Sequence, residues 1–220
     1  MEWIDIAVER TSAATDLLLS LLAIALVVWL ARAPGDPFKR WLWGAIFGLL
    51  AVAAGLGAMA HGLRLAPGTY QALWQPIFLS LGWSVGLFVV AVVLDVRGRR
   101  AALRALPVIL LLGLGFYGMT VWLGGDFLIF VVYQTAALLT ALIAYGLLAL
   151  RGHLEGARWL VLGVVVMLGA SAIQATGALR FTWVWPFDHN GIFHLLLMPA
   201  VVCLAVGVGH SLRRPSGPAP

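Results

Sequence analysis

The sequence has few charged side chains. Only 10% of its 220 residues are Asp, Glu, Lys or Arg, whereas 62% are hydrophobic and the mean hydropathy is +1.00. Such a chain has too little polar surface to cover a water-soluble globule. In lipid every backbone polar group must be paired internally, and the long unbroken apolar runs favour helices over a barrel. We therefore expect an all-α integral membrane protein, placed in a bacterial inner (cytoplasmic) membrane.

Cysteine and lysine are almost absent. The single cysteine, Cys203, excludes a disulfide framework and a cysteine-based metal cluster. The single lysine, Lys39, is expected in a loop, which leaves no helical lysine to hold a retinal Schiff base. The motifs G-x-S-x-G and H-E-x-x-H and the P-loop are also missing. The net charge of +5 comes from basic residues in short loops, as membrane topology requires, so we expect no nucleic-acid partner.

Seven apolar runs are long enough to cross about 30 Å of hydrocarbon as helices. They predict a seven-transmembrane-helix bundle that forms one domain over residues 1–212, followed by a disordered cytoplasmic tail over 213–220. The sequence leaves the oligomeric state open. The predicted helices cover residues 14–32, 41–63, 76–96, 105–123, 127–150, 158–179 and 190–212.

The basic residues predict how the bundle is oriented. Eleven of the 14 Lys and Arg residues fall in alternate loops and the tail, and only Arg10, Arg64 and Arg180 fall on the opposite side. Cytoplasmic loops carry the excess of Lys and Arg, so the N-terminus is expected outside and the C-terminus in the cytoplasm. The eleven are Arg32, Lys39, Arg40, Arg97, Arg99, Arg100, Arg104, Arg151, Arg158, Arg213 and Arg214.

Polar side chains gather toward the outer side of the predicted spans. Such groups are costly at membrane depth, and their clustering is therefore a functional signal. We expect a polar cavity that opens toward the outer face and takes up membrane lipids or another amphiphile. Its candidate residues are His61, Gln71, Gln75, Asp126, Tyr133, Gln134, Gln174, Asp188, His189, Asn190 and His194.

The spacing at the start of the last helix limits which histidines can act together. At 100° per residue Asn190 and His194 share a face, whereas His189 joins His61 and His194 only if it lies in the preceding loop. Three imidazoles and a water would suit a catalytic zinc ion, with Asp188 or Asp126 moving protons or orienting a ligand. Asp188 or Asn190 can equally be a simple cap of this helix.

Two local patterns resemble a known superfamily. Ala60-His61-Gly62 ends the second predicted helix, and Asn190-Gly191-Ile192-Phe193-His194 begins the seventh. Together with seven helices, these resemble the CREST superfamily, which includes alkaline ceramidases and adiponectin-receptor-like proteins. The resemblance implies an intramembrane hydrolase of lipid amide or ester bonds, with zinc held by His61 and His194.

Three functions therefore remain open from the sequence. The first is the zinc-dependent lipid hydrolase. The second is a non-enzymatic protein that binds or senses a lipid or small amphiphile through Asn190, Gln75 and Gln174. The third is a haem-binding electron-transfer protein, with His61 and His194 as axial ligands and His153 and His210 as a remote pair.

Overall fold

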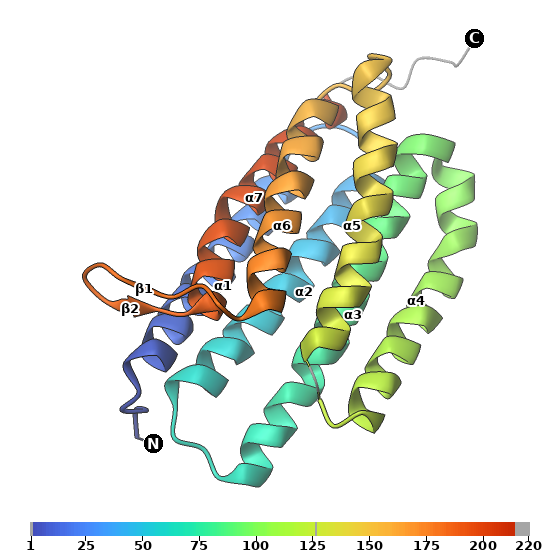
Figure 1. The fold of residues 1–220 in the computed structure, drawn as a ribbon. Coiled ribbons are helices and arrows are strands. Elements are labelled where there is room, and N and C mark those ends of the chain that lie inside the picture. Colours follow the sequence, from blue (N-terminus) through green and yellow to red (C-terminus); the bar gives the residue numbers. More distant parts are fainter. Residues whose placement is uncertain (1, 126, 214–220) are drawn as a thin grey trace.

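The computed structural model describes residues 2–125 and 127–213, which form seven long helices and one short hairpin (Figure 1). Each of these seven helices is long and apolar enough to cross a membrane, as predicted. The helices are α1 (Ala7–Arg32), α2 (Pro37–Gly62), α3 (Pro67–Arg97), α4 (Arg99–Trp122), α5 (Phe127–Leu150), α6 (Ala157–Thr176) and α7 (His189–Leu212). The hairpin strands are β1 (Phe181–Thr182) and β2 (Pro186–Phe187).

Several helix ends differ from the predicted ones. α1 begins at Ala7 rather than at 14, and α3 begins at Pro67 rather than at 76. Apolarity identifies only the middle of a helix, which continues through polar residues until a cap or a glycine stops it. α6, in contrast, ends at Thr176 rather than at 179, because Gly177 follows in the left-handed conformation with φ +62°.

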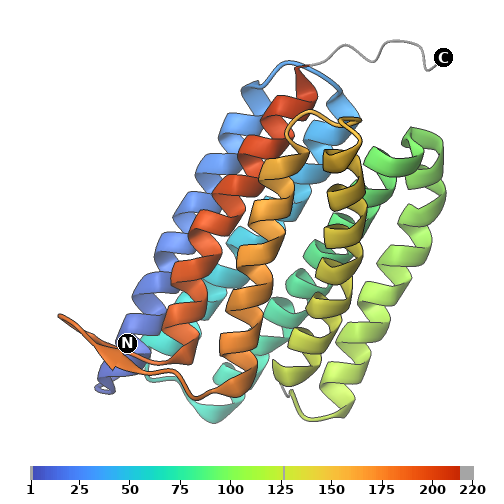
Figure 2. The ribbon, with the colours of Figure 1, turned by 45° about the horizontal axis from the view of Figure 1, so that its top comes forward.

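Six of the seven helices form a ring, and the remaining helix, α4, lies outside it. Contacts run in order through α1, α2, α3, α5, α6 and α7, and α7 closes back onto α1. α4 packs mainly against α3 and touches α5 only lightly, so it lies at the outer edge of the bundle in both views (Figures 1 and 2). The space inside the bundle is therefore enclosed by six helices. We call the end where α1 and α7 begin the N-terminal end, and the end where they finish the C-terminal end.

The hairpin projects sideways from the N-terminal end, past α1 (Figure 1). β1 and β2 pair antiparallel, with Phe181 opposite Phe187, and β2 contacts both α1 and the start of α7. The turn between the strands presents Trp183 and Trp185, which are 85% and 65% exposed. Such aromatic exposure suits a membrane interface better than water.

The prediction that Lys39 lies in a loop was wrong. Lys39 lies in the first turn of α2, which begins at Pro37 because Asp36 caps it by accepting from the backbone N–H of Phe38. Its ammonium is buried and lies 2.5 Å from the carboxylate of Asp95 on α3. Tyr145 of α5 donates its hydroxyl to the same carboxylate at 3.3 Å. The protein therefore has a lysine within a helix, and the argument that no helical lysine is present was wrong.

Candidate functional site

A cavity runs along the inside of the six-helix ring. It contains about 970 Å³ of empty space, counting the part that opens outward. Most of its polar described side chains gather toward the N-terminal end, whereas Ser84 lies farther along and donates its hydroxyl to the backbone oxygen of Ile46. The rest of the wall is largely Leu, Ile, Val, Phe and Ala. The polar lining residues are Asp16, His61, Ser84, Gln134, Asn190 and His194.

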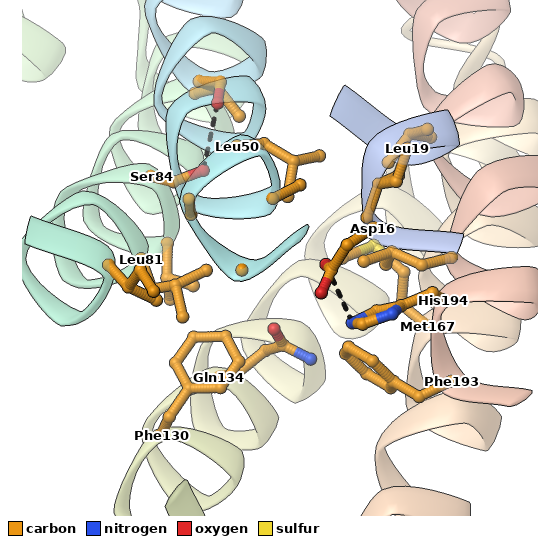
Figure 3. A pocket seen from close by; sticks show the side chains of 18 of the residues that line it. Asp16, Leu19, Leu50, Leu81, Ser84, Phe130, Gln134, Met167, Phe193 and His194 are labelled. Atoms are coloured by element: carbon orange, nitrogen blue, oxygen red, sulfur yellow. Dashed lines mark hydrogen bonds and ion pairs between the residues drawn. The ribbon is translucent and has the colours of Figure 1, made fainter. Parts of the chain in front are cut away.

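A carboxylate and an imidazole form the centre of this polar end. The Nε2 atom of His194 lies 3.3 Å from Oδ1 of Asp16 (Figure 3), and its Nδ1 atom lies 3.2 Å from the hydroxyl of Thr15. All three side chains are buried. Because both ring nitrogens lie beside a partner, the imidazole of His194 is held in orientation, with its Nε2 atom turned toward the Asp16 carboxylate.

Sequence reasoning missed Asp16, although it lies inside the first predicted span. The buried face of α1 is polar near its start, since Ser12, Thr15, Asp16 and Ser20 are all buried, while Leu17 and Leu21 are exposed. Spacings of three and four residues place the four polar residues on one face of the helix. This polar stripe was the signal that could have identified Asp16.

The second imidazole belongs to His61 in the last turn of α2. Its Nδ1 atom lies 2.7 Å from the carboxylate of Glu9 on α1. Because an ionised carboxylate only accepts, Nδ1–H donates to Glu9, and Nε2 is left to accept from the amide of Asn190 at 3.4 Å. The ring of Trp74 stands edge-on to the imidazole with centroids 6.0 Å apart. His61 therefore turns its Nε2 edge toward Asn190 at the start of α7.

Asp188 caps α7, as one of the two sequence interpretations held. Its Oδ1 atom accepts from the backbone N–H groups of Asn190 and Gly191 at 3.1 and 3.0 Å, and Ser12 donates its hydroxyl to the same oxygen at 3.4 Å. The cap thus fixes the start of α7 against α1. This contact positions Asn190 and His194 relative to Asp16.

Two predicted amides lie at or beside the cavity. Gln134 of α5 is buried and donates to the hydroxyl of Ser171 on α6 at 2.8 Å. It faces Asp16 and His194 from the far wall (Figure 3). Gln174 of α6 lies outside the lining residues and donates to the amide oxygen of Asn190 at 3.3 Å. Gln174 therefore helps to hold Asn190 in place from outside the cavity.

The other predicted residues lie elsewhere. Tyr133 donates its hydroxyl to the backbone of Gly82, Gln75 accepts from Tyr117, and Gln71 is exposed near the start of α3. His189 is the first residue of α7 and is not among the described residues that line the cavity. Asp126 lies outside the described residues.

The polar end has the donor types that zinc prefers. His61, His194 and Asp16 offer two imidazoles and a carboxylate, and each imidazole is held through Nδ1, as metal-binding histidines usually are. Within residues 2–125 and 127–213, however, no three His, Cys, Asp or Glu side chains are close enough to share one metal ion. The donor chemistry at the polar end therefore suits zinc.

Comparison with known protein families gives a match to the sequence of this chain. Residues 11–213 match a group described as a family of unknown function (DUF6962). The chain belongs to this family. Searches of curated proteins and of solved structures gave no match. The segment shared with DUF6962 contains Asp16, His61 and His194, so the polar end of the cavity lies within it.

Proposed function

We propose that the chain spans a membrane seven times, with α1 beginning outside and α7 ending in the cytoplasm. The outward-facing surfaces of the described helices are rich in apolar residues such as Leu21, Leu111 and Ile143, while polar side chains point inward. This arrangement suits lipid as the surrounding solvent. The excess of Lys and Arg toward the C-terminal end supports the orientation.

Cysteine labelling tests this orientation. In a Cys203→Ala background, Trp183→Cys is expected to react with a membrane-impermeant maleimide on intact cells, because residue 183 lies in the exposed hairpin at the N-terminal end. Arg151→Cys, in the exposed loop at the other end, is the matched control and should react only after the cells are opened. The reverse pattern would contradict the proposed orientation.

We further propose that the protein binds an amphiphilic, lipid-like molecule inside the ring. One observation carries this proposal: a single cavity has most of its polar side chains toward its N-terminal end and a largely apolar wall along the rest of its length. A hydrocarbon chain fits the apolar wall, and a polar head finds Asp16, Asn190 and His194 at the end. Sites for small molecules usually combine an apolar lining with a few convergent polar groups.

A cavity-filling substitution tests amphiphile binding. Ala137 lines the cavity from α5, whereas its neighbour Ala136 is exposed on the outer face. Ala137→Phe is expected to reduce the amphiphile retained by the purified protein, measured by native mass spectrometry, at least tenfold, since a phenyl ring occupies the tail path. Ala136→Phe should retain the wild-type amount. Equal retention by both variants, or no retained molecule in the wild-type protein, would contradict the proposal.

A zinc-dependent hydrolase of lipid amide or ester bonds is the second candidate. The observation that favours it is the support of both imidazoles through Nδ1, by Glu9 for His61 and by Thr15 for His194. If a metal is held there, it would supply Lewis-acid activation of a water or a carbonyl.

Elemental analysis of the purified protein tests the metal directly. His61→Ala and His194→Ala are expected to lose most of the zinc, while His153→Ala, in an exposed loop at the C-terminal end, should keep it. Wild-type protein without zinc would end this candidate. A Soret band in the same sample would instead support the haem interpretation.

A further inference from the structure

Three carboxylates gather around the two imidazoles at the polar end. Glu9 contacts His61 at 2.7 Å, Asp16 contacts His194 at 3.3 Å, and Asp188 caps α7 beside them. Three negative charges against at most two positive ones leave a net charge of −1 when both imidazoles are protonated, and −3 when neither is. The polar end is therefore acidic in every protonation state of its histidines while its carboxylates are ionised.

No basic side chain among the described residues offsets this charge inside the cavity. Among the described residues, neither lysine nor arginine lines the cavity. Arg10 and Arg64 lie at the same end but are paired with Asp5, outside the cavity. Asp5 is 70% exposed at its side chain, so these pairs belong to the surface. A cationic ligand would therefore meet uncompensated negative charge.

Asp16 also offers an oxygen for a hydrogen bond from a ligand. Its side chain is 6% exposed, and its Oδ1 atom contacts His194. The hydrogen bonds among the described residues include none to its other oxygen, Oδ2, and Asp16 is a lining residue of the cavity. Oδ2 faces Gly57 of α2, where even a methyl group would come within 2.8 Å of it. The glycine therefore makes room for the carboxylate at the cavity wall.

We propose that the cavity selects amphiphiles whose head is a protonated primary amine, with the ammonium seated on Asp16 and the hydrocarbon chain along the apolar wall. This inference rests on the proposed amphiphile binding. An ammonium supplies a full positive charge and three N–H donors, which match the excess negative charge and the available Oδ2 atom of Asp16. An alcohol supplies one donor and no charge. A carboxylate adds like charge beside Asp16 and is rejected.

Three compounds with the same decyl chain separate these cases. Decylammonium, decanol and decanoate are titrated below their micellar concentrations, at neutral pH, into the purified full-length protein, and binding is followed by the shift in thermal unfolding. Decylammonium is expected to bind about tenfold or more tightly than decanol, because hydrogen bonds to a charged group are stronger than neutral ones. Decanoate should bind weakest. Methylammonium, which has the head without the tail, should give no shift.

Two isosteric variants identify the carboxylate responsible. Asp16→Asn is expected to remove the preference for decylammonium over decanol while still binding both, whereas Asp5→Asn, an exposed carboxylate at the same end, should keep the wild-type preference. If Asp16→Asn does not fold, Glu9→Gln takes its place and should weaken the preference, because Glu9 contacts the cavity residue His61.

The outcomes distinguish the proposed amine selectivity from the proposed amphiphile binding on which it rests. Equal binding of all three decyl compounds, or an unchanged preference in Asp16→Asn, overturns the amine selectivity and leaves amphiphile binding intact. Failure of every decyl compound to bind overturns the proposed function itself.

Discussion

Replacement of Asp95 by alanine is expected to destabilise the bundle by about 3 to 5 kcal/mol. The substitution leaves the Lys39 ammonium, whose side chain is 7% exposed, without its partner 2.5 Å away. It also removes the acceptor of the Tyr145 hydroxyl, and Tyr145 is fully buried. An uncompensated buried charge costs far more than an ordinary packing defect. The measurement is equilibrium unfolding of the detergent-solubilised protein, by circular dichroism.

The double variant Lys39→Met, Asp95→Leu distinguishes the cost of losing the ion pair from the cost of leaving the Lys39 ammonium buried without a partner. It should regain most of the stability, because apolar side chains of similar size can replace a buried ion pair at little cost. Asp5→Ala is the surface control. Its pairs with Arg10 and Arg64 are exposed, so it should cost no more than about 1 kcal/mol. A loss of similar size in Asp95→Ala and Asp5→Ala would show that the Lys39 ammonium remains hydrated in the folded protein.

Lys39 illustrates what hydropathy alone can and cannot predict. Seven apolar runs were enough to predict seven helices, since only a helix or a closed barrel can satisfy the backbone in lipid. The same runs placed the start of the second helix at 41, after Lys39. The Asp36-Pro37 pair, a cap followed by a proline in the first turn, carried the correct boundary. Local capping chemistry fixes helix ends, and average apolarity does not detect it.

The candidate site was predictable only where its residues lie close in sequence. A period of 3.6 residues put Asn190 and His194 on one face, and both line the cavity. The partners of His194 are Thr15 and Asp16, nearly the whole chain away, and no spacing along the sequence relates them. Only the closure of the ring by α1 against α7 brings them together. The polar stripe on α1 would have shown that the helix faces inward, without showing which helix it meets.

A second large loss of stability is expected at Gly156, where the start of α6 packs closely against α7. Gly156 precedes α6 with φ +81°, and a Cβ atom there would lie 2.2 Å from the backbone oxygen of Gly207 on α7. Gly156→Ala is therefore expected to cost about 3 to 5 kcal/mol, because left-handed backbone strain adds to a clash with a backbone that cannot move aside. Thermal unfolding in detergent measures the loss.

Gly152, in the same loop, isolates the contribution of the clash. It also has a positive φ, +65°, but a Cβ atom added there meets no heavy atom within 4 Å. Gly152→Ala should therefore cost only the backbone strain, about 1 to 2 kcal/mol. The difference between the two variants measures how tightly α6 is held against α7, and α7 carries both Asn190 and His194. Equal losses would mean that α7 can shift to accommodate the methyl group, and the fixed geometry of His194 against Asp16 would then have to come from α1 alone.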